Sequence, residues 1–134
     1  MGHSCLDFGG RTVLLDDSSI NTIVRLMANE IESCNLDRAA SESLSRRLQA
    51  WVSEIEESGV GCIDIRLDDS LSDTRAVEQT LKLLDAVETT IRGFGDTVPR
   101  SFFRKAVGPE YYQDVEARII LRDLNKFRNL LIGG

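Results

Sequence analysis

The sequence predicts an α+β fold that is predominantly helical, with four main helices packed on one side of a small sheet in the order ββααβαα. Two observations indicate the sheet: a pair of β-prone runs joined by two glycines, and one strictly alternating segment near the middle of the chain. The third observation is a set of four stretches whose apolar residues recur at helical spacing. A chain of 134 residues, 42% of them hydrophobic, is long enough to bury one core. We therefore expect a single domain over residues 1–134, with residues 1–4 forming a mobile terminus.

The N-terminal hairpin is predicted from residues 5–8 and 11–15, which flank Gly9 and Gly10. A two-residue hairpin turn requires positive φ, which glycine adopts without steric cost. Helices can cover only one side of so small a sheet, so we expect an open face or an exposed edge.

Two helices are expected to follow the hairpin. The Asp-Asp-Ser-Ser run at residues 16–19 offers N-capping oxygens for the first helix, and Asn35 suits its C-terminal end. Asp37 can cap the second helix, and Gly59 ends it. The apolar stripes that predict these helices are Ile20, Ile23, Val24, Met27 and Ile31 in the first, and Leu44, Leu48, Trp51, Val52 and Ile55 in the second.

The segment 62–68 alternates strictly between apolar and charged residues, which predicts the third strand of the sheet. Ile63, Ile65 and Leu67 would share the buried face of this strand. The opposite face, which must be solvated or paired, would carry Asp64, Arg66 and Asp68.

The remaining helices are expected in the C-terminal half. A long helix starts near Asp73 and ends at Gly93 or Gly95, and Pro99 can begin a short helix in the connector that follows. The Gly108-Pro109 pair then breaks the chain, and a final helix is predicted over residues 110–132.

Composition excludes several classes of protein. The formal net charge of −6 argues against sequence-independent binding of nucleic acid, whose phosphates carry the same sign. Cys5, Cys34 and Cys62 are too few and too far apart for a disulfide scaffold, which favours a cytoplasmic protein with reduced thiols in or near the core. No stretch approaches 18 uninterrupted apolar residues, so we expect no membrane span.

Catalytic and cofactor motifs are missing from the sequence. The only imidazole, His3, lies near the terminus, and no nucleotide-binding, phosphate-binding or zinc-binding fingerprint occurs, so we expect no cofactor and no bound metal. One alternative is a small magnesium-dependent enzyme that uses strand carboxylates. Asp64 and Asp68 could serve it only with help from another strand, because their Cα atoms would lie about 13 Å apart.

The distribution of charge is more informative than any motif. Residues 1–98 carry a balance of −9 and residues 99–134 a balance of +3. Glutamates at the C-terminus of a helix oppose the helix dipole, so the glutamates that end the second helix do not stabilise it. The residues predicted to contact a partner are Glu54, Glu56, Glu57, Asp64, Arg66, Asp68 and Asp69.

The last helix carries a second charged surface. Arg118, Arg122 and Lys126 recur every four residues and therefore form one basic stripe. Intramolecular pairing, a protein contact and a nucleic-acid groove are all compatible with this stripe.

These observations favour a non-enzymatic binding protein. A small acidic domain with localised carboxylates is suited to a basic protein surface, because complementary charge accelerates encounter and sets register. Inhibitors and immunity proteins that occlude basic toxins, such as nucleases, have this character, so we expect a hetero-complex of this type. The other alternative is a regulatory or structural homo-oligomer such as a homodimer.

Overall fold

The computed structural model describes residues 2–133 and confirms an α+β fold dominated by helices. The elements, in chain order, are β1 (His3–Phe8), β2 (Arg11–Asp16), α1 (Asp17–Glu30), α2 (Arg38–Glu57), α3 (Leu67–Ser70), α4 (Thr74–Gly93), β3 (Thr97–Val98), α5 (Arg100–Ala106), β4 (Val115–Glu116) and α6 (Ala117–Ile132). The four main helices expected from the sequence are therefore α1, α2, α4 and α6.

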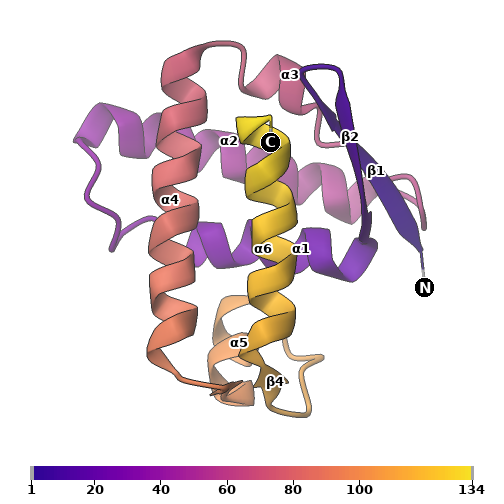
Figure 1. Ribbon diagram of the computed structural model, residues 1–134, viewed down its shortest axis with the longest axis vertical. Helices are drawn as coiled ribbons and strands as arrows, with labels where there is room; N and C mark the ends of the chain where they lie inside the picture. Colours follow the sequence, from indigo (N-terminus) through magenta and orange to yellow (C-terminus); the bar gives the residue numbers. More distant parts are fainter. Residues whose placement is uncertain (1, 134) are drawn as a thin grey trace.

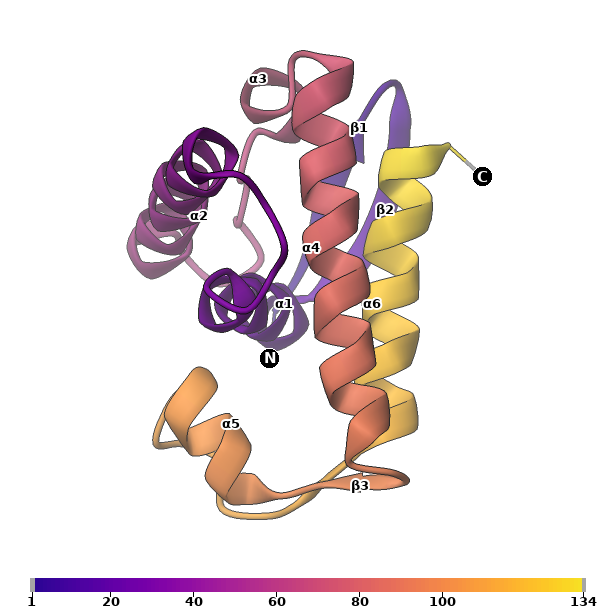
Figure 2. The same ribbon diagram turned by 90° about the vertical axis from the view of Figure 1, so that its left-hand side faces the viewer.

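The long helices form two crossed layers. In Figure 1, α4 and α6 stand side by side and run in opposite directions, while α1 and α2 cross behind them. Figure 2 shows the α1 and α2 layer nearly end-on, with the β1–β2 hairpin reaching along α6. Large side chains fill the core, among them the fully buried Trp51, Phe103 and Phe127. Trp51 is thus a core residue, as its place on the apolar stripe predicts.

The hairpin forms as predicted. Strands β1 and β2 pair antiparallel with Phe8 opposite Arg11, and the turn residues Gly9 and Gly10 have φ of 57° and 79°. One correction concerns its start, because β1 begins at His3 and Ser4 is 2% exposed. The expectation of a mobile terminus is therefore wrong for residues 3 and 4, and Met1 lies outside the described residues.

The expected N-cap at Asp37 is confirmed, and Asp73, near which a helix was expected to start, also caps its helix. The side chains of Asp37 and Asp73 accept hydrogen bonds from the amides of Ala40 and Ala76, respectively, at 2.8 and 2.7 Å. Asp16 occupies the N-cap position of α1 but makes no capping bond, and it pairs with His3 instead.

The predicted strand over residues 62–68 does not form. Its burial pattern is as expected, since Ile63, Ile65 and Leu67 are buried, but residues 62–66 join no sheet and Leu67 begins α3. Two local contacts account for this. The Asp64 carboxylate accepts a hydrogen bond from the Arg66 amide at 3.0 Å, and Arg66 adopts a left-handed conformation with φ of 51°. Both turn the chain where a strand would continue straight.

The sheet content therefore differs from the prediction. In place of one three-stranded sheet, the described residues form two separate antiparallel pairs, β1–β2 and β3–β4. The second pair is only two residues long on each side, and it joins the end of α4 to the start of α6.

The last helix begins at Ala117, later than the predicted 110. Side chains of α5 hold the carbonyls of the preceding loop: Arg104 donates to Tyr111 at 2.7 Å and Arg100 to Tyr112 at 2.8 Å. These carbonyls are therefore occupied, and residues 115–116 pair with β3.

The thiols also differ from the expectation. Cys34 is half-buried, but Cys5 and Cys62 are exposed, so these two do not contribute to the core. Burial raises the pKa of the Cys34 thiol.

Candidate protein-binding surface

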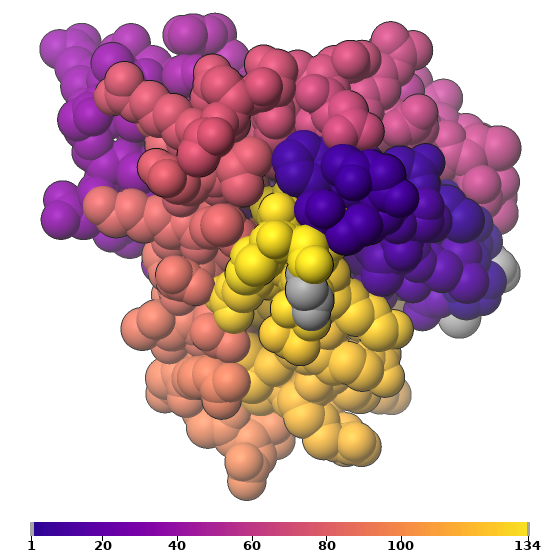
Figure 3. All heavy atoms as spheres, turned by 45° about the horizontal axis from the view of Figure 1, so that its top comes forward, coloured from indigo at the N-terminus to yellow at the C-terminus, as the bar shows by residue number. Residues whose placement is uncertain are grey.

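The segment that joins α2 to α4 runs along the hairpin from its open end to its turn. At the open end, the Gly61 amide donates to Asp17 Oδ2 at 2.7 Å and the Ile63 amide donates to Ser4 Oγ at 3.0 Å. At the turn, the Gly9 amide donates to Asp68 Oδ1 at 2.9 Å. A strand rises about 3.3 Å per residue, so these contacts spread the segment over roughly 20 Å. Figure 3 shows the indigo hairpin bordered by the rose-coloured end of this segment.

Six of the seven predicted partner-binding residues are carboxylates on this segment or in the last turn of α2. We call them the acidic track: Glu54, Glu56, Glu57, Asp64, Asp68 and Asp69. Glu54 is half-buried and the others are exposed. Of these residues, Asp68 binds the hairpin turn, Asp64 follows Ile63, whose amide binds Ser4 near the open end, and Glu56 lies against Arg25 of α1.

Few internal cations neutralise the acidic track. Glu56 pairs with Arg25 of α1 at 2.8 Å, and no other carboxylate of the track forms an ion pair within residues 2–133. Arg66, the seventh predicted residue, is exposed between Asp64 and Asp68 and makes no ion pair in the same range. Most of the track's negative charge therefore faces solvent unpaired.

The alternation of the sequence sets which side chains are exposed. Ile63, Ile65 and Leu67 pack into the core and thereby direct the intervening charged residues outward. Behind them, Trp51 Nε1 donates to Ser70 Oγ at 3.1 Å, which ties α3 to α2. The track is therefore carried by backbone anchored at several points to the rest of the fold.

Asp17 is the junction at the open end of the hairpin. Its carboxylate accepts hydrogen bonds from the buried Ser4 hydroxyl at 2.5 Å and from the Gly61 amide. These two donors favour the charged form and lower the pKa of Asp17 below its usual value of 3.8. The Ser4 hydroxyl in turn accepts a hydrogen bond from the Ile63 amide, so one small network joins β1, α1 and the segment that leads to Asp64.

Two of the three residues of the predicted basic surface pair with nearby carboxylates. Arg118 pairs with Glu116 at 2.7 Å, and Arg122 contacts Asp123 at 3.4 Å. Lys126 joins no ion pair within the part of the chain that the structure describes. The three residues therefore lie on one helix as predicted, but only Lys126 keeps an unmatched charge.

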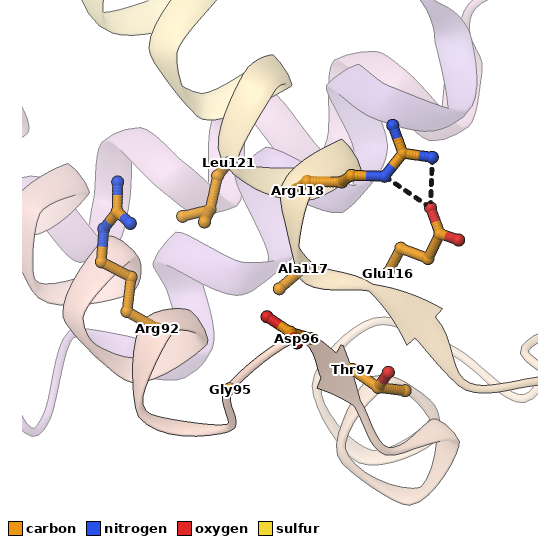
Figure 4. A pocket seen from close by; sticks show the side chains of 8 residues that line it. All are labelled: Arg92, Gly95, Asp96, Thr97, Glu116, Ala117, Arg118 and Leu121. Atoms are coloured by element: carbon orange, nitrogen blue, oxygen red, sulfur yellow. Dashed lines mark hydrogen bonds and ion pairs between the residues drawn. The ribbon is translucent and has the colours of Figure 1, made fainter.

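A hollow of about 520 Å³ lies where α4, β3, β4 and α6 meet. Arg92 and Arg118 stand on its two sides, and Figure 4 shows Arg118 turned toward Glu116. Arg92 pairs within its own helix with Glu88 at 3.3 Å. Both guanidinium groups are thus engaged at the surface, at side-chain exposures of 64% and 82%.

Sequence reasoning missed a buried carboxylate in α6. Asp123 is only 5% exposed, and it lines a cleft of about 200 Å³ between α1 and α6. The signal was present, because Asp123 falls between Ile120 and Phe127 on the apolar stripe of the last helix. A charged residue on a core-facing stripe is rarely buried without a partner.

Two further findings concern residues 2–133. They contain no group of three or more His, Cys, Asp or Glu side chains that could hold a metal ion. None of their helices is both long enough and apolar enough to cross a membrane. Comparison with models of known families, with curated proteins and with solved structures found no match.

Proposed function

We propose that this protein is a non-enzymatic binding domain whose acidic track docks on a basic surface of a partner protein. The observation that carries the proposal is the acidic track itself: five of its six carboxylates are exposed, and within residues 2–133 only Glu56 has a cation partner. Complementary charge of this kind speeds encounter and fixes the orientation of the bound partner. In this proposal the domain acts by occlusion, as inhibitors and immunity proteins of basic toxins do.

The pairing of charges elsewhere supports the choice of this face. Several cations of the basic C-terminal segment have carboxylate partners: Arg100 lies near Asp114, and Arg128 is joined to α4 through Asp85 at 2.7 Å and Glu88 at 3.4 Å. By contrast, five of the six carboxylates of the track have no cation partner within residues 2–133. The hairpin turn and α1 hold this segment, because the Gly9 amide donates to Asp68 and the Gly61 amide donates to Asp17, so little ordering is required on binding.

The test is capture of a partner from the source organism by the immobilised protein at low and high salt, with matched charge variants. One variant, Glu57→Gln/Asp64→Asn/Asp69→Asn, removes three charges from the track and keeps Asp68, which binds the hairpin turn. The control, Glu32→Gln/Glu78→Gln/Glu110→Gln, removes three charges at exposed positions outside the track.

The proposal predicts that a basic protein is captured by the native chain and the control and is lost with the track variant. Capture should also weaken between about 0.05 and 0.5 M salt, because the screening length falls well below 10 Å. A partner retained equally by both variants would contradict the proposal.

A further inference from the structure

We propose that the cleft between α1 and α6 is a second binding site, which takes a primary ammonium group on a short alkyl chain. This chemistry is that of a lysine side chain or of a small free amine. The site does not depend on the acidic track, so its failure would leave the proposed function untouched.

The inner wall of the cleft carries Asp123. Its side chain is 7% exposed, and it has one good hydrogen bond, from Ser19 Oγ at 2.8 Å, together with a long contact from Arg122 Nε at 3.4 Å. A carboxylate offers about four acceptor positions. Burying one with so few donors costs free energy that an incoming cation would offset.

The other polar groups of the cleft suit an N–H donor. Tyr111 Oη and Thr22 Oγ1 lie 2.6 Å apart, and one of the two oxygens can donate to the other while still accepting from a ligand. Asp16 adds a second carboxylate at the edge, where it pairs with His3. An ammonium group has three donors and no acceptor, which matches an acceptor-rich wall.

The remaining walls are apolar and the space is small. Ile23, Val115, Ile119 and Ile120 line the cleft. Its volume of about 200 Å³ corresponds to roughly six or seven water-sized groups at about 30 Å³ each. A butyl chain ending in an ammonium therefore fits, with its methylenes against the apolar residues.

Among residues 2–133, Arg122 is the one cation that lines the cleft, and its contact with Asp123 is weak. The Arg122 side chain is 60% exposed and reaches the carboxylate through a single nitrogen at 3.4 Å. The distance is long and the guanidinium itself is mostly exposed, so the guanidinium can move into solvent when a better donor arrives.

The experiment is an NMR titration of the native protein with n-butylammonium chloride, followed through the amides of residues 18–23 and 119–123. Saturable shifts confined to these amides are expected. n-Butanol, which has nearly the same shape without the charge, and tetramethylammonium, which has the charge without an N–H donor, should bind at least about tenfold more weakly. Equal shifts with either compound, or none with n-butylammonium, would overturn the proposal.

Two variants locate the site. Asp123→Asn keeps the shape and the Ser19 bond and should weaken binding at least about tenfold. If this variant does not fold, Ile119→Arg places a repelling charge at the 36% exposed rim without touching the buried group, and it should weaken binding similarly. Its matched control is Ile132→Arg, which adds the same charge to an exposed position at the far end of α6 and should bind as the native chain does. Undiminished binding by Ile119→Arg would refute the assignment.

A last arm separates the two sources of the ammonium. Nα-acetyl-lysine methylamide carries the same group on a peptide backbone. If it binds like n-butylammonium, the cleft accepts a lysine of a protein; if only the free amine binds, the cleft takes a small molecule.

Discussion

Replacing Ser4 with alanine tests how the segment that carries Asp64 is held to the hairpin. Ser4 is 2% exposed. Its hydroxyl donates a hydrogen bond to Asp17 at 2.5 Å and accepts one from the Ile63 amide at 3.0 Å. Alanine leaves the Ile63 amide buried without a partner, which costs about 1–3 kcal/mol. Asp17 keeps the Gly61 donor and gains water, so its loss is about 1 kcal/mol.

Together these losses predict that Ser4→Ala lowers the free energy of unfolding by about 2–4 kcal/mol. At roughly 3 °C per kcal/mol for a chain of this length, the Tm should fall by about 6–12 °C. Urea denaturation followed by circular dichroism measures the first quantity, and a thermal scan measures the second.

The matched control is Ser53→Ala, at an exposed position on α2, which should change the stability by no more than about 0.5 kcal/mol. If Ser4→Ala were as mild as this control, the network would not anchor the segment, and the geometry of the track would need another explanation.

Three further predictions concern other contacts. Because the native pKa of Asp17 lies below its usual value of 3.8, the stabilisation by the Asp17 carboxylate is complete above that pH and is lost as the pH falls through the native pKa. Asp17→Asn should therefore lower the free energy of unfolding at pH 6 in urea melts, and the difference from the native chain should shrink toward pH 2. A difference that stays constant with pH would refute the assignment. Arg66→Gly should stabilise by about 0.5 kcal/mol by relieving the left-handed φ of 51°, and Arg66→Ala, which keeps the Cβ, should not; equal effects in chemical denaturation would disprove a backbone origin. Arg11 donates to the Leu130 carbonyl at 3.1 and 2.7 Å near the end of α6, so Arg11→Met should cost about 1–2 kcal/mol and raise hydrogen exchange of the last turn of α6, an effect that unchanged exchange would rule out.

Local signals predicted much of the fold. The Gly9-Gly10 turn and the capping aspartate Asp37 act within a few residues, so their chemistry can be read from the sequence alone. The helix spacing likewise identified α1, α2 and α4, and most of α6.

The errors concern segments whose structure depends on distant contacts. Alternation predicted which side of residues 62–68 is buried, but whether they form a strand depends on hydrogen-bond partners elsewhere in the chain. The Ile63 amide donates its hydrogen bond to the side chain of Ser4, 59 positions away, and not to the backbone of a neighbouring strand. The start of α6 is similarly set by the arginines of α5, which hold the carbonyls of residues 111 and 112.

The candidate sites show the same division. The residues of the acidic track were identified from charge and alternation, but their placement along the hairpin depends on the contacts of Asp17 with Gly61 and of Asp68 with Gly9. The cleft was missed because it is assembled from α1, α6 and the loop at Tyr111, which only the tertiary packing brings together.

The most direct test of the central claim is the salt-dependent affinity of the captured partner for the native chain and the two triple variants. We predict that Glu57→Gln/Asp64→Asn/Asp69→Asn weakens binding at least about tenfold at low salt and flattens its salt dependence. Glu32→Gln/Glu78→Gln/Glu110→Gln should bind nearly as the native chain does. Equal weakening by both variants, or an affinity that does not change with salt, would contradict the claim that the acidic track is the docking surface.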